Sequence, residues 1–177
     1  MTETASVGEA SAPPSQRTLE SYTNAFPDAD AEALATHLAV TSTGGLLTRE
    51  IEAIIQQLGF DLSRPRYTII RWLYLSPETG MAQSDLAQAL RVSGPNITQL
   101  IDGLASEGWV ERVTSPTDRR VVHARLTSEG KKRASRLVPT IVEFMEESVQ
   151  KLSADEQAEL RRLLDKVRFS VEEARGS

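Results

Sequence analysis

Polar residues that can read DNA bases open one short segment of the sequence. Ser93-Gly94-Pro95-Asn96 begins a predicted helix, and Thr98 and Gln99 follow within its first two turns. Asn and Gln can form paired hydrogen bonds with adenine, and the amides at a helix N-terminus attract a phosphate. The candidate DNA contacts of this helix are Ser93, Pro95, Asn96, Thr98 and Gln99. The alternative is that Ser93 only caps the helix and the others are solvated.

Two arginines mark the tip of a predicted hairpin just downstream. Pro116-Thr117-Asp118-Arg119-Arg120 separates two β-rich runs, Trp109 to Val113 and Val121 to Leu126. A cationic hairpin tip can reach a minor groove or the phosphates of DNA. Asp118 can also pair with Arg120 and brace the turn. Both roles are compatible, and we expect Arg119 or Arg120 to face DNA.

The elements around these residues follow the order of a winged helix-turn-helix. A short helix, with Ser84 as its expected cap, carries inward Leu86, Ala87 and Leu90, and Val92-Ser93-Gly94 makes the turn. The next helix has an apolar stripe at the i, i+3, i+4 and i+7 spacing, formed by Ile97, Leu100, Ile101 and Leu104. The predicted fold class is mainly α with a small β-hairpin wing (α+β).

Amphipathic helices flank this module on both sides. Upstream, helical periodicity begins at Asp28, and Gly44-Gly45 marks either a kink or a junction between two helices. Ser63 caps a further helix, in which Pro65 is tolerated in the first turn. Downstream, a helix runs from Thr127 to about Leu152, and Ser153 with Glu156 forms a capping box for a last helix. The apolar face of that helix consists of Leu160, Leu163, Leu164 and Val167.

The apolar faces of these flanking helices must be covered, and homodimerisation is the simplest way to cover them. The predicted organisation is therefore a disordered tail at residues 1–16, an N-terminal dimerisation segment at 17–63, a DNA-binding module at 64–130 and C-terminal dimerisation helices at 131–177. A twofold protein matches a pseudo-palindromic DNA site.

Charge is distributed unevenly along the 177 residues. The whole chain has a net charge of −5, yet residues 64–136 carry 12 basic and 7 acidic side chains. Local Lys and Arg density governs phosphate binding, so an acidic protein with a basic central region can bind DNA. The alternative is a solvated surface with uneven charge.

Several other classes of protein are disfavoured. The sequence has no Cys, which excludes disulfides and thiolate ligands. It has no His-Glu-x-x-His, Gly-x-Ser-x-Gly, Walker A or Gly-x-Gly-x-x-Gly string, which disfavours an enzyme. His37 and His123 are the only histidines, so we expect no metal and no cofactor. No apolar run is long enough to span a bilayer, and no secretory signal precedes the helices, so we expect a cytoplasmic protein.

Several short strings in this order resemble the MarR family of bacterial transcriptional regulators. They are Ser84-Asp85-Leu86-Ala87, Gly108-Trp109-Val110-Glu111-Arg112, Asp118-Arg119-Arg120 and Leu126-Thr127-Ser128-Glu129-Gly130, within a match covering roughly Ala31 to Arg168. The resemblance implies a homodimer that binds a pseudo-palindromic operator, usually represses transcription, and releases double-stranded DNA when a small aromatic or phenolic effector binds.

The resemblance also assigns further site residues. In similar proteins the helix carrying Tyr67, Trp72 and Tyr74 borders the effector pocket, and Arg66 and Arg71 are available to meet an anion. Aromatic residues at helical spacing alternatively belong to the core.

The predicted helix that begins at Ser93, which would be the recognition helix of such a protein, departs from the family pattern at two positions. It has Gln99 and Gly103 where family members often carry Arg or Lys, so Arg91 and Arg64 or Arg66 are candidate compensating contacts with DNA. A winged-helix module that binds proteins, without specific DNA binding, is the alternative function.

Overall fold

The computed structural model describes residues 14–76, 79–114 and 121–176. Contacts divide the chain into two compact units, one ending at Glu50 and the other beginning at Ile51. The first unit contains α1 (Pro14–Ala25) and most of α2 (Ala31–Gln57). The second contains α3 (Arg64–Leu75), β1 (Met81–Ala82), α4 (Gln83–Leu90), α5 (Gly94–Ser106), β2 (Val110–Thr114), β3 (Val122–Leu126), α6 (Ser128–Glu147) and α7 (Ala154–Gly176).

The N-terminal helices differ from the sequence prediction in two respects. α1 was not predicted, and because it begins at Pro14, the expected disordered tail does not extend to residue 16. α2 is continuous through Gly44-Gly45, so these glycines do not separate two helices. Its start lies just after Asp30, whose Oδ1 accepts a hydrogen bond from the Ala33 amide at 3.0 Å. This side-chain cap explains why α2 begins at Ala31 and not at Asp28.

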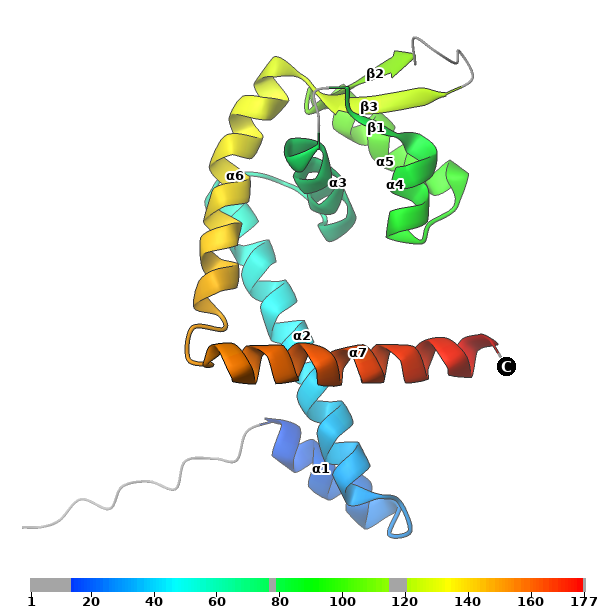
Figure 1. The fold of residues 1–177 in the computed structure, drawn as a ribbon, viewed down its shortest axis with the longest axis vertical. Helices are drawn as coiled ribbons and strands as arrows, with labels where there is room; N and C mark the ends of the chain where they lie inside the picture. The colour runs from blue at the N-terminus through cyan, green and yellow to red at the C-terminus, as the bar shows by residue number, and fades with distance from the viewer. Residues whose placement is uncertain (1–13, 77–78, 115–120, 177) are drawn as a thin grey trace, which may run out of the picture. The chain divides into compact units, whose positions relative to one another are not determined.

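A three-stranded antiparallel sheet lies beside α3, α4 and α5 in the second unit (Figure 1). The strand order is β1-β3-β2, with Val110 opposite Leu126 and Met81 opposite Ala124. The hairpin of β2 and β3 confirms the predicted wing strands. β1 is an addition, and Gly80 permits it: a Cβ at this residue, where φ is 76°, would lie 2.2 Å from the carbonyl oxygen of Ala124.

Two helix boundaries in this unit were predicted incorrectly. α4 begins at Gln83 after Ala82, so Ser84 lies inside the helix and does not cap it. α6 ends at Glu147, and the segment up to Leu152 forms turns. The predicted capping box of α7 is confirmed, because Glu156 accepts a hydrogen bond from the Ser153 amide at 2.8 Å. That bond, followed by the one from the Ser153 hydroxyl, lowers the pKa of Glu156.

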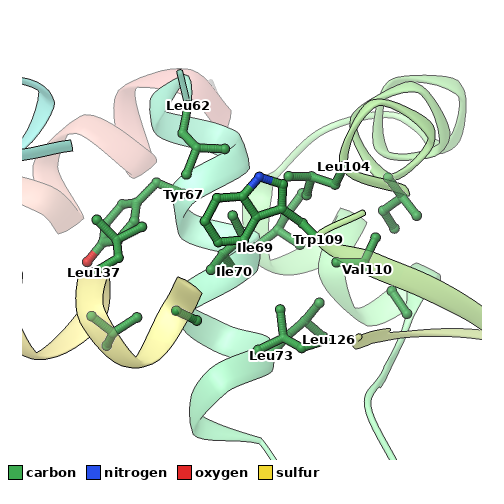
Figure 2. Close-up of a cluster of buried hydrophobic side chains, with 14 of the residues drawn as sticks. Leu62, Tyr67, Ile69, Ile70, Leu73, Leu104, Trp109, Val110, Leu126 and Leu137 are labelled. Atoms are coloured by element: carbon green, nitrogen blue, oxygen red, sulfur yellow. The ribbon is translucent and has the colours of Figure 1, made fainter. Parts of the chain in front are cut away.

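One hydrophobic core joins the sheet to the helices of the second unit. Trp109 packs edge to face against Phe60, with ring centroids 5.2 Å apart. Figure 2 shows Trp109 among side chains from α3, α5, the sheet and α6. Of the predicted stripe on α5, Ile97, Ile101 and Leu104 are buried, and Leu100 is partly buried against the same core. The buried face of α5 therefore fixes which of its residues point outward.

The apolar face of α7 remains exposed in the single chain. Its residues Leu160, Leu163, Leu164, Val167 and Val171 are each 40–53% exposed and recur at helical spacing. Exposed large apolar side chains also occur in the first unit, namely Tyr22 on α1, Phe26 directly after it, and Leu46 and Leu47 on α2. No helix in the described ranges is long and apolar enough to cross a membrane.

Candidate nucleic-acid interface

The first turns of α5 present a row of polar side chains to solvent. Asn96, Thr98 and Gln99 are exposed, whereas Ile97 points into the core. Ser93 is the N-cap, and its Oγ accepts a long hydrogen bond, 3.5 Å, from the Asn96 amide. Pro95 lies in the first turn, where its missing N–H removes no intrahelical bond. Five of the predicted DNA contacts thus lie together at the positive end of one helix.

The turn that leads into α5 contains the only non-glycine residue with a positive φ among the described residues. Arg91, with φ 55° and ψ 42°, caps α4 through its backbone, because its N–H donates to Gln88 at 3.1 Å. Its guanidinium pairs with Glu172 of α7 at 2.7 Å, and the hydrogen bond from Arg91 is the main cause of the lowered pKa of Glu172. The Arg91 side chain is nevertheless 73% exposed.

Arg112 of β2 contacts the recognition helix directly, a role that the sequence analysis did not assign. Its Nη2 lies 2.8 Å from Asp102 Oδ1 and 3.4 Å from the carbonyl oxygen of Thr98. Residues two apart on a strand share a face, so Arg112 lies on the same side as buried Val110. That alternation, together with Asp102 on the outer side of α5, was the signal that could have predicted the contact.

Arg66 does not join the predicted DNA contacts. It forms an ion pair with Glu107 at the C-terminal end of α5, and its side chain is only 18% exposed. Asn96 lies at the other end of that helix, roughly 16 Å away at 1.5 Å per residue. Arg64, the first residue of α3, is exposed.

The tip of the wing lies outside the described residues. Asp118, Arg119 and Arg120 belong to the segment 115–120, so the predicted brace and phosphate contacts remain predictions. The strands that carry the tip are described up to Thr114 and from Val121.

The five residues of the predicted effector pocket do not line one common pocket in the described part of the chain. Tyr67 is 3% exposed and belongs to the core, as the alternative proposed. Burial raises the pKa of its phenol, and Arg71, with its guanidinium 5.9 Å from the ring centroid, opposes that shift. Trp72 packs against the same core, and Arg66 is engaged by Glu107.

Tyr74 instead lines an open groove of about 800 Å³ at the end of α3. Its other lining residues come from β2, β3 and the start of α6 or lie beside them; they are Leu73, Ser76, Glu111, Arg125, Leu126, Ser128, Lys131, Lys132 and Ser135. Glu111 accepts a hydrogen bond from Arg125 Nε at 2.7 Å. Three cations and one carboxylate thus surround a partly apolar groove.

The two histidines lie in different units. His123 is half-buried on β3, with its Nδ1 3.3 Å from the Thr79 carbonyl oxygen, and His37 lies on α2. In the described ranges no group of three or more His, Asp or Glu side chains is placed to hold a metal ion.

The three-stranded sheet, the paired helices α4 and α5 and the exposed polar end of α5 define a winged helix-turn-helix DNA-binding protein. Residues 60–121 match the model of the MarR family. The HTH-type transcriptional regulator PecS of Dickeya dadantii (strain 3937) is 26% identical over 150 residues, covering 84% of this chain and 89% of PecS. Residues 60–121 therefore resemble the DNA-binding module of the MarR family, and the chain is similar over most of its length to DNA-binding transcriptional regulators.

Solved structures agree with this assignment. AbsC, a MarR family transcriptional regulator from Streptomyces coelicolor, is 28% identical with a TM-score of 0.68, covering 85% of this chain and 97% of AbsC. A second MarR family regulator from the same organism, solved in complex with DNA, has a TM-score of 0.71 at 22% identity and covers 81% of this chain and 93% of its own. The latter likeness shows the fold alone.

Proposed function

We propose that the protein is a homodimeric repressor that binds a pseudo-palindromic operator and is released by a small aromatic anion. The observation that carries the DNA-binding part is the polar N-terminal end of α5, where Asn96, Thr98 and Gln99 are exposed over a buried apolar stripe. These side chains suit base edges in a major groove, and the amides of the first turn suit a phosphate. The wing arginines, Arg119 and Arg120, supply the second contact.

The homodimer is supported by the unpartnered apolar faces at both ends of the chain. Monomeric proteins rarely expose such a continuous stripe as Leu160, Leu163, Leu164 and Val167 of α7. Residues 17–63 and 131–177 would form the dimer, while 64–130 bind one half-site each. A twofold protein doubles the phosphate contacts available to a single module and matches a DNA site of the same symmetry.

Selection from fragmented genomic DNA of the source organism tests the proposal. The full chain, incubated at two salt concentrations, should enrich one pseudo-palindrome near promoters. The affinity for that duplex should fall with a log-log salt slope of about −0.9 per phosphate contact. Asn96→Ala and Gln99→Ala should each weaken binding to it by on the order of 1 to 3 kcal/mol, because each removes a base contact.

Gln56→Ala is the matched control for this experiment, since Gln56 is an exposed residue of α2 outside the DNA-binding module. It should bind the selected duplex like the parent. If no motif is enriched, or if Asn96→Ala and Gln99→Ala behave like the control, α5 does not read DNA bases. That result would favour a protein-interaction module.

The groove beside Tyr74 is the proposed site for the effector. Its volume falls within the range of small-molecule sites, and its walls combine Leu73 and Leu126 with Arg125, Lys131 and Lys132. An aromatic carboxylate would suit this lining, since its ring would pack against the apolar side chains and its carboxylate would pair with the cationic ones.

Thermal unfolding with 4-hydroxybenzoate tests this site. At one hundred times its dissociation constant, a ligand specific to the native state adds about 2.7 kcal/mol, which is several degrees in Tm. The neutral 4-hydroxybenzamide should give little shift, and Lys132→Gln should reduce the shift caused by the acid. Lys151→Gln, outside the groove, is the control. An equal response of parent and Lys132→Gln to the acid would place the effector elsewhere.

A further inference from the structure

The C-terminal end of the recognition helix is held by two arginines from two other helices. Arg66 of α3 places Nη2 2.5 Å from Glu107 Oε2, and Arg133 of α6 donates from Nη1 to the Glu107 carbonyl oxygen at 3.1 Å. Glu107 is the C-cap of α5, and its own N–H donates to Gly103 at 3.2 Å. Glu107 therefore connects the end of α5 to α3 and to α6.

Arg133 is itself fixed on three sides. Its guanidinium lies 5.5 Å from the centroid of the Trp109 ring, and its Nε is 3.1 Å from Glu129 Oε1. Trp109 is 3% exposed, so the ring is a rigid platform for the cation. A planar guanidinium held by a ring, a carboxylate and a carbonyl has little rotamer freedom left.

The backbone beside Glu107 is tied to the start of α6 as well. Thr127 donates from Oγ1 to the Gly108 carbonyl oxygen at 2.7 Å and from its amide to the Trp109 carbonyl oxygen at 3.1 Å. The same Oγ1 accepts from the Gly130 amide at 2.8 Å, which caps α6. The end of α5 and the beginning of α6 thus share one hydrogen-bond network, which we call the α5–α6 joint: Glu107, Gly108, Trp109, Thr127, Gly130 and Arg133.

We propose that the α5–α6 joint, with Arg66, sets the angle at which α5 presents Asn96 and Gln99, so that Arg66, Glu107 and Arg133 are positioning residues for DNA sequence readout. Asn96 lies roughly 16 Å from Glu107 along the helix. A rotation of about 5° at the joint would move the reading end by about 1.4 Å, more than the 0.5 Å or so that a binding constellation tolerates. This inference rests on the proposed function of α5 in reading bases.

Substituting only one partner of the ion pair between Arg66 and Glu107 would also lower the stability of the fold. Arg66 is mostly buried, and its Nε has no hydrogen-bond acceptor among the described residues. Glu107→Gln alone leaves a buried cation with no ion partner, which destabilises the fold for reasons unrelated to DNA. The double variant Arg66→Met/Glu107→Gln removes both charges and restores an apolar fit, so it separates stability from positioning.

The test measures the affinity for the enriched genomic duplex and for a shuffled duplex of equal composition, using full-length variants. Arg133→Gln and Arg66→Met/Glu107→Gln should lower affinity for the enriched duplex by on the order of tenfold and leave the shuffled duplex and the salt slope unchanged. Glu159→Gln, which breaks an exposed ion pair with Arg162 on α7, is the matched control and should behave like the parent.

If Arg66 and Glu107 contribute to stability alone, the folded double variant binds the enriched duplex like the parent. That outcome overturns the inference while leaving the proposed function intact. Hydrogen exchange gives a readout that needs no DNA. The amides of residues 104–109 should exchange faster in Arg133→Gln, and an unchanged profile there would overturn the inference even if no duplex were enriched.

Discussion

At the residue scale, three arginines of the basic central region have different partners. Arg112 pairs with Asp102 on the outer side of α5, Arg66 pairs with Glu107 at its far end, and Arg91 pairs with Glu172. Residue type and local charge density predict that a region binds phosphates, but they do not predict which arginines pair with carboxylates of the same chain. The partner depends on which elements pack together, and that information is not local in sequence.

Gly130 is a residue whose identity is set by one close approach. A Cβ here would lie 1.9 Å from the carbonyl oxygen of Trp109, a backbone atom that cannot rotate away. Gly130→Ala should therefore push α6 from the end of α5 and lower the free energy of unfolding by about 1 to 3 kcal/mol. Urea unfolding followed by circular dichroism would measure this loss.

Gly103→Ala is the matched control, because Gly103 lies inside α5 and, apart from its chain neighbours and the adjacent helix backbone, no atom lies within 4 Å of an added Cβ. Alanine is the better helix former, so this variant should gain up to about 1 kcal/mol. Equal stability of the two variants would show that the contact between Gly130 and Trp109 relaxes at no cost.

At the scale of elements, the long amphipathic segments were predictable and the short ones were not. The stripe of Ile97, Ile101 and Leu104 predicted α5 and its outer face, and Ser153 with Glu156 predicted the start of α7. β1 has only two residues, and its strand geometry comes from pairing with β3, which no local pattern encodes. α1 escaped prediction because its composition is polar and its apolar face is narrow.

Local sequence patterns predicted one part of the candidate site and missed another. The exposed polar N-terminal end of α5 could be predicted, since polar residues after an N-cap are a local signal. Two sets of contacts could not be predicted, because each joins residues from separate elements. They are the contact of Arg112 with α5 and the contacts of Arg66 and Arg133 with Glu107. The predicted effector residues shared a helix, but Tyr67 near its start is buried in the core, whereas Tyr74, two turns further along, lines the groove.

At the scale of the whole molecule, the exposed face of α7 bears on the assembly state. Leu164 lies within the stripe of exposed apolar side chains and is 42% exposed in the single chain. Leu164→Glu should place a charge in the proposed dimer interface and shift the molar mass from about twice 19.5 kDa toward 19.5 kDa. Light scattering after size-exclusion chromatography measures this mass.

Ala158→Glu is the control for that experiment, since Ala158 lies on the opposite side of α7 at helical spacing and is also exposed. It should keep the mass of the parent. A parent that is already monomeric at micromolar concentration, or a dimer unchanged by Leu164→Glu, would remove α7 from the interface.

The pairing of β1 with β3 has a consequence for synthesis on the ribosome. Met81 cannot pair until its strand partner Ala124 has been synthesised. The carbonyl oxygen of Glu107 cannot accept its hydrogen bond until Arg133, 26 residues further along the chain, has been synthesised. The recognition helix is therefore translated before the strand and the helix that hold it. A nascent chain halted inside the wing carries every residue of α5 that we propose to read bases, but not the elements that orient them, so the proposed competence to recognise DNA would arise late in translation.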